Sequence, residues 1–92
     1  MKFKVGNILN EYALPAPAQG DTEERWVSSY IIVAVNRYAT DEQISCVCIF
    51  DADDQDDHSP GLTIHLDFDT VLSPTYGFHG RRIKWREAQI EV

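Results

Sequence analysis

Lysine and arginine are missing from the middle of this sequence: none occurs between Ala39 and Gly80. The same span holds nine Asp and Glu residues, and the 92-residue chain has a formal net charge of −7. Phosphate groups repel such a chain, so we do not expect nucleic acid or an anionic membrane surface as its main partner. The charge favours a basic protein partner, a cation or plain solubility.

Long apolar runs are also missing. No run approaches the roughly 18 apolar residues that a transmembrane helix needs, and the first residues lack the apolar segment and cleavage site of a secretion signal. We therefore expect a cytoplasmic protein with no membrane partner. No segment has apolar residues at helical spacing over several turns, which argues against a helical fold.

Cysteine is scarce, and the two that occur, Cys46 and Cys48, lie two residues apart on one expected strand. Side chains at that spacing point the same way, a poor geometry for a mutual disulfide, so we expect reduced core thiols. His58, His65 and His79 could join them around zinc, but a single residue between two cysteines fits a tetrahedral zinc site poorly. We expect core packing and no metal.

Motifs that assemble a catalytic site are absent as well. The sequence contains no Gly-x-Ser-x-Gly, no Walker loop and no His-Glu-x-x-His. A nucleophile needs a base within hydrogen-bond reach and a third group that orients this base, and no spacing here predicts such a set. We expect no enzymatic activity and no cofactor.

Alternating apolar and polar residues, in contrast, are abundant and predict β-strands. The alternation is cleanest in 62–68, where Leu62, Ile64, Leu66 and Phe68 share one face. The segment 44–50 is apolar on both faces and is expected in the centre of the sheet, and β-branched residues dominate 26–38. The predicted strands are Phe3–Leu9, Trp26–Tyr38, Ile44–Phe50, Leu62–Phe68 and Arg81–Val92.

These strands predict a single all-β domain, residues 1–92, folded as a small barrel with a long first loop, Asn10–Arg25. Strict alternation in 26–38 places Val33 and Val35 on one face and Tyr30 and Ile32 on the other. One helical turn is expected between Asp69 and Gly80. The predicted core is Phe3, Val5, Ile8, Val33, Val35, Ile49, Leu62, Ile64, Leu66, Ile83 and Trp85.

The order of these elements resembles that of SH3-like small barrels. The long first loop stands where those proteins have the RT loop, and Leu72-Ser-Pro-Thr-Tyr76 is similar to the turn before their last strand. The opening Phe3-x-Val-Gly-x-Ile8 resembles the start of many bacterial and phage SH3-like barrels. The resemblance implies a five-stranded SH3-like barrel with an acidic hairpin. The Ala-Leu-Tyr-Asp-Tyr motif and the tryptophan pair of signalling SH3 domains are absent, so polyproline binding is not implied.

The acidic hairpin joins the strands at 44–50 and 62–68, and its loop carries five aspartates in seven positions. Oxygen ligands at alternate positions suit a hard cation, but Asp56 stands where a calcium loop has glycine and Leu62 where it needs a bidentate glutamate. A solvated turn that prevents strand pairing with neighbours is one alternative, and a charged contact surface is another. The candidate partner-binding residues are Asp51, Asp53, Asp54, Asp56, Asp57, Asp67 and Asp69.

Spaced carboxylates can also imitate a phosphate backbone. In size and charge the chain resembles small acidic phage proteins, including anti-restriction and anti-CRISPR proteins. That resemblance implies an inhibitor that engages a basic surface of a nucleic-acid-handling protein as a DNA mimic. The alternatives are a structural component that forms homo-oligomers through the edge of the strand at 26–38, and a cation-binding domain that uses Asp51–Asp57.

Basic and aromatic residues suggest a second surface. Arg82, Lys84 and Arg86 are expected on the outward face of the last strand, opposite Ile83 and Trp85. Trp26, Tyr30, Tyr76 and Trp85 are expected in the core or at the barrel mouth. Two of these aromatic side chains, if exposed beside the long first loop, would form a binding patch.

Overall fold

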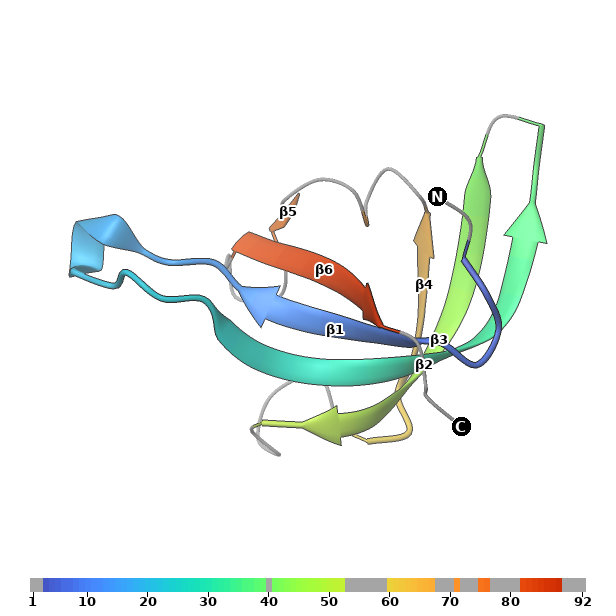
Figure 1. Ribbon diagram of the computed structural model, residues 1–92, viewed down its shortest axis with the longest axis horizontal. Helices are drawn as coiled ribbons and strands as arrows, with labels where there is room; N and C mark the ends of the chain where they lie inside the picture. Colours follow the sequence, from blue (N-terminus) through green and yellow to red (C-terminus); the bar gives the residue numbers. More distant parts are fainter. Residues whose placement is uncertain are drawn as a thin grey trace.

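The computed structural model describes residues 3–39, 41–52, 60–67, 71, 75–76 and 82–88. They form one antiparallel sheet with the strand order β4-β3-β2-β1-β6-β5 (Figure 1). The prediction of an all-β fold is therefore confirmed. The strands are β1 (Ile8–Ala13), β2 (Arg25–Arg37), β3 (Glu42–Asp51), β4 (Thr63–Asp67), β5 (Thr75–Tyr76) and β6 (Arg82–Ala88).

The chain runs as a meander from β1 to β4, and then returns so that β6 pairs with β1. Figure 1 shows β2 lying along β1 and then turning away to form a hairpin with β3, which curls the sheet. The outermost strands of the described sheet are β4 and β5, and no pairing joins them there. The sheet of the described residues is thus curled but not closed into a barrel.

The first strand lies further along the chain than its alternation predicted. It begins at Ile8 because residues 4–7 form a turn, in which Gly6 has a φ of 93° and Asn7 N donates to Lys4 O. Strand β1 then continues through Asn10 and Glu11, whose polar side chains had indicated a loop instead of a strand. The predicted loop Asn10–Arg25 is correspondingly shorter, and a 3-10 helix, η1 (Pro17–Gln19), lies near its tip. Figure 1 shows this connection projecting from one end of the sheet.

The predicted faces of β2 are shifted by β-bulges. Ile32 pairs with Cys46 and Ala34 with Ser45, so Val33 is an extra residue that reverses the alternation. Val33 is 46% exposed as a result, and Val35 returns to the core side. A bulge resets which face a side chain occupies, and strict alternation cannot anticipate it.

The core lies on the inner face of the curled sheet. Phe3, Ile83 and Trp85 are buried as predicted, whereas Val5 is 63% exposed because it lies in the turn before β1. Val35, Leu62, Ile64 and Leu66 pack against the core, and Ile8 and Ile49 are half-buried. The buried apolar residues are Phe3, Leu9, Val27, Tyr30, Ile32, Ile44, Cys46, Cys48, Val71, Ile83 and Trp85.

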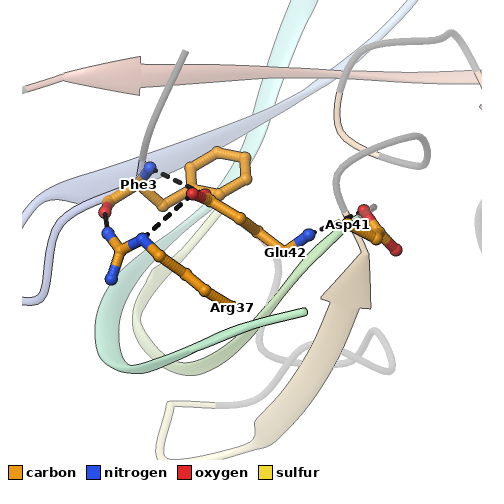
Figure 2. A network of polar contacts seen from close by, with 4 residues as sticks. All are labelled: Phe3, Arg37, Asp41 and Glu42. Atoms are coloured by element: carbon orange, nitrogen blue, oxygen red, sulfur yellow. Dashed lines mark hydrogen bonds and ion pairs between the residues drawn. The ribbon is translucent and has the colours of Figure 1, made fainter. Parts of the chain in front are cut away.

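Polar contacts fix the N-terminal segment against the β2–β3 hairpin (Figure 2). Phe3 N donates to Glu42 Oε2 at 3.1 Å, and Arg37 Nη2 donates to Phe3 O at 2.9 Å. Arg37 and Glu42 also form an ion pair, with 3.1 Å between Arg37 Nε and Glu42 Oε1. Asp41 Oδ1 accepts a hydrogen bond from Glu42 N. Both backbone groups of Phe3 are therefore satisfied while its ring enters the core.

Candidate functional site

The predicted acidic surface is only partly described. Asp51 ends β3 and Asp67 ends β4, and both are half-buried. The negative charge of Asp51 lies near Cys48 and Tyr30, so this carboxylate borders the core of the sheet. The other candidate residues, Asp53, Asp54, Asp56, Asp57 and Asp69, lie outside the described residues. Of the segment between Asp69 and Gly80, in which one helical turn is expected, the structure describes Val71, which is helical and buried, and Thr75–Tyr76, which form β5.

The strands that flank the acidic loop are not the strand that carries the exposed cations. The span without Lys or Arg supplies β3 and β4 at one side of the strand order, and also the two uncharged residues of β5 at the other. The cations Arg82, Lys84 and Arg86 are exposed on β6, which β1 and β2 separate from β3. Their predicted outward direction is thus confirmed, and the acidic and basic segments lie on different parts of the sheet.

A carboxylate lies in the core beneath β1. Glu11 is 1% exposed and pairs in register with Ser28 on β2 and Trp85 on β6. Ser28 Oγ donates to Glu11 Oε1 at 2.9 Å. Burial, and then the charge of Glu11, raise the pKa of Tyr30 far above its ordinary value, so this phenol stays protonated at neutral pH. No sequence signal marked Glu11 as buried.

The two cysteines are free thiols on the inner face of β3. Burial, together with the nearby Glu87 carboxylate, raises the pKa of Cys46 to about 12. Burial and the charge of Asp51 likewise raise the pKa of Cys48. Both thiols are therefore protonated and unreactive at neutral pH. Within the part of the chain that the structure describes, no group of three His, Cys, Asp or Glu side chains could hold a metal ion.

Aromatic and basic side chains share the outer face of the sheet, away from the core. Register pairs place Phe50, Ser29, Asn10 and Arg86 in one row across β3, β2, β1 and β6. In the next row, Tyr12 pairs with Trp26 on β2 and with Lys84 on β6. Directly paired residues share a face of the sheet. Arg82, two residues before Lys84 on β6, is on the same face. We call the resulting surface the outer patch: Tyr12, Trp26, Phe50, Arg82, Lys84 and Arg86.

Hydrogen bonds hold Trp26 in the outer patch. Its Nε1 donates to Ser29 Oγ at 2.9 Å, and Ser29 Oγ donates to Asn10 Oδ1 at 2.6 Å. Trp26 is nevertheless 40% exposed, and Phe50, beside Ser29 in register, is 62% exposed. The patch therefore offers two exposed rings, one of which is fixed in orientation before any partner arrives.

The cations of this face differ in their partners. The Arg86 guanidinium lies over the Tyr12 ring, with its Cζ 5.1 Å from the ring centroid. It also forms an ion pair with Glu24, in which Arg86 Nη2 and Glu24 Oε2 are 2.7 Å apart. Arg82 and Lys84 are exposed and have no ion pair with any residue for which the structure gives a position. Among the described residues, two cations of β6 are thus exposed without an ion-pair partner.

The sequence anticipated the outer patch only in part. Of the four aromatic residues singled out, Trp26 is exposed, while Tyr30 and Trp85 pack edge to face in the core with their ring centroids 5.7 Å apart. The side chain of Tyr76 lies outside the description. Tyr12 and Phe50 were missed, because Tyr12 was assigned to a loop and Phe50 follows an inward alternation that a bulge interrupts.

Comparison with protein families, curated proteins and solved structures finds no match to this chain. None of the described residues belongs to a helix that is long and apolar enough to cross a membrane.

Proposed function

We propose that this protein acts by binding another protein, with the acidic span 51–69 placed against a basic surface. The carrying observation is that β3 and β4 flank the acidic loop, while the exposed cations Arg82, Lys84 and Arg86 lie on β6, which β1 and β2 separate from β3. Concentrated charge repels itself and lowers stability, so its segregation needs a functional reason. Electrostatic complementarity to a partner supplies that reason, because it speeds association and fixes orientation.

The partner that fits this chemistry is a nucleic-acid-handling protein. Its basic groove is built for phosphates, which spaced carboxylates imitate, so the bound protein would act as an inhibitor of the phage type. The strongest nucleophiles of the chain, Cys46 and Cys48, are buried and protonated, which favours binding over catalysis. Reduced core thiols also suit a cytoplasmic location.

The SH3-like barrel remains part of this proposal. A four-strand meander, whose first strand also pairs with the last long strand, supports it. Closure of the sheet into a barrel would require the two outermost strands to approach one another through the segments between them.

The experiment compares two variants of equal net charge. Asp54→Asn with Asp56→Asn removes two charges from the acidic loop, and Asp21→Asn with Glu23→Gln removes two charges outside it. Asp21 Oδ1 accepts from Glu23 N, and an asparagine oxygen can still accept there, so the control should keep its loop. Partners captured from lysate at low salt are identified by mass spectrometry, purified and titrated with each variant.

The proposal predicts that the loop variant associates with the purified basic partner about tenfold more slowly, while the control keeps the wild-type rate. Added salt should slow the wild type more than the loop variant. Wild-type protein should also displace DNA from this partner. Equal association rates for both variants, or a partner without a basic surface, would contradict the proposal.

A further inference from the structure

The outer patch is chemically unlike the acidic span, and it does not depend on the proposed function. Its two exposed rings lie on one face of β1, β2, β3 and β6 with Arg82 and Lys84, two cations that have no ion pair with any described residue. Exposed aromatic side chains beside cations are the composition of binding surfaces, where aromatic residues and arginine contribute most of the affinity.

Spacing defines what the patch can hold. Arg82 and Lys84 are two residues apart on β6, so their side chains leave the same face about 6.8 Å apart. Carboxylates on alternate residues of an extended polypeptide have the same separation. The row from Arg86 to Phe50 runs from β6 across β1 and β2 to β3, which places the backbone of Phe50 roughly 14 Å from that of β6.

The held conformation of Trp26 supports binding without a large ordering cost. Its indole is fixed by Ser29, which Asn10 fixes in turn. Arg86 is likewise held by Tyr12 and Glu24. Side chains that are immobile before binding lose less entropy when a ligand arrives.

We propose that the outer patch binds an extended acidic segment of a partner protein, with carboxylates on alternate residues facing Arg82 and Lys84 and an apolar side chain between Trp26 and Phe50. Charge complementarity argues for this occupant. A nucleic acid strand carries a charge on every nucleotide, and the chain's net charge of −7 opposes it more strongly than it opposes a segment with two carboxylates.

The test selects binders from a random-peptide display library with the immobilised wild-type protein. Enriched peptides are synthesised, together with versions in which every Asp and Glu is replaced by its amide, and a single-stranded oligonucleotide is titrated in parallel. Trp26 is an internal reporter, because its 40% exposed ring should shift to shorter emission wavelength when covered, whereas Trp85 is already buried.

Each patch variant has a matched control. Lys84→Gln removes a free cation, and Lys4→Gln removes an exposed cation from the turn before β1. Phe50→Ala removes the ring of a residue that is 62% exposed, and Tyr38→Ala removes the ring of a residue that is 60% exposed and directly follows β2. All four side chains are exposed, so each variant should fold, and circular dichroism checks this.

The proposal expects enriched peptides with carboxylates at alternate positions beside an apolar residue. Lys84→Gln should weaken them about fivefold, Phe50→Ala roughly thirtyfold, and the two controls less than twofold. Selection without acidic enrichment, or equal losses in patch and control variants, would overturn it. Tighter binding of the oligonucleotide with the same residue dependence would overturn it in favour of nucleic acid. Failure here would leave the acidic-span proposal standing, because that proposal is tested on different residues.

Discussion

Adjacent residues on β1 and β2 point to opposite faces of the sheet, and their contacts differ accordingly. Glu11 is 1% exposed beneath β1, while its neighbour Tyr12 supports Arg86 on the outer face. Ser28 donates to Glu11 inside, and Ser29 donates to Asn10 outside. One position along a strand thus separates a group that stabilises the core from a group that shapes a binding surface.

The largest expected difference between the faces comes from two neighbouring aliphatic residues. Leu9 is fully buried on the inner face, and Ile8 is half-buried on the outer face. Leu9→Ala should lower the free energy of unfolding by about 2–5 kcal/mol, because it leaves a core cavity. Ile8→Ala should cost about 1 kcal/mol. Denaturant unfolding of both variants measures this, and equal losses would place the two residues in the same environment.

Alkaline pH should act on the inner face. The pKa of Cys46 is raised from 9.0 to about 12 by burial, so between these values the unfolded chain loses a proton that the folded chain keeps. The contribution of Cys46 to the free energy of unfolding is therefore fully present below pH 9. It falls as the pH rises toward 12, by up to about 1.4 kcal/mol per pH unit. Tyr30, whose pKa burial also raises, adds to the loss above its ordinary value.

Unfolding by urea across this pH range tests that expectation. For Cys46→Ala, the free energy of unfolding should fall less steeply with pH than for the wild type, because the variant lacks one of the buried protons. A variant slope as steep as that of the wild type would show that Cys46 does not titrate between these limits.

The two serines offer a smaller and closely matched comparison. Ser28→Ala removes a donor from the buried Glu11 carboxyl and should cost about 1–3 kcal/mol. Ser29→Ala releases Trp26 and Asn10, which water can reach, and should cost roughly 0.5–1 kcal/mol. Thermal unfolding orders the two losses, and the reverse order would contradict the assignment of Ser28 to the inner face.

Sequence reasoning located strands better than faces. Alternation placed β4 and β6 with their inward and outward sides correct, since neither carries a bulge in its described pairing. It failed in β2, where an extra residue at Val33 reverses the pattern. It also failed at β1, where Gly6 delays the strand and the polar Asn10 and Glu11 continue it.

The candidate surfaces were predictable to different degrees for the same physical reason. The acidic span and the cations of β6 are visible as charge, which needs no register. The outer patch depends on which residues pair across strands, and this register is set by turns and bulges that composition does not encode. The sequence did not indicate that Glu11 is buried, because its burial is evident only from the contacts that Ser28 and Tyr30 provide in the folded chain.

Fluorescence quenching of the two tryptophans tests the separation of the two faces most directly. Of the two substitutions that it needs, Trp26→Phe on the outer face should affect stability least. Trp26→Phe leaves the buried Trp85, whose emission should lie at shorter wavelength and resist quenching by acrylamide. Trp85→Phe leaves Trp26, whose 40% exposed ring should emit at longer wavelength and be quenched several-fold more strongly. Equal quenching in two variants that circular dichroism finds folded would contradict the account, because Trp26 would then not lie on an open outer patch.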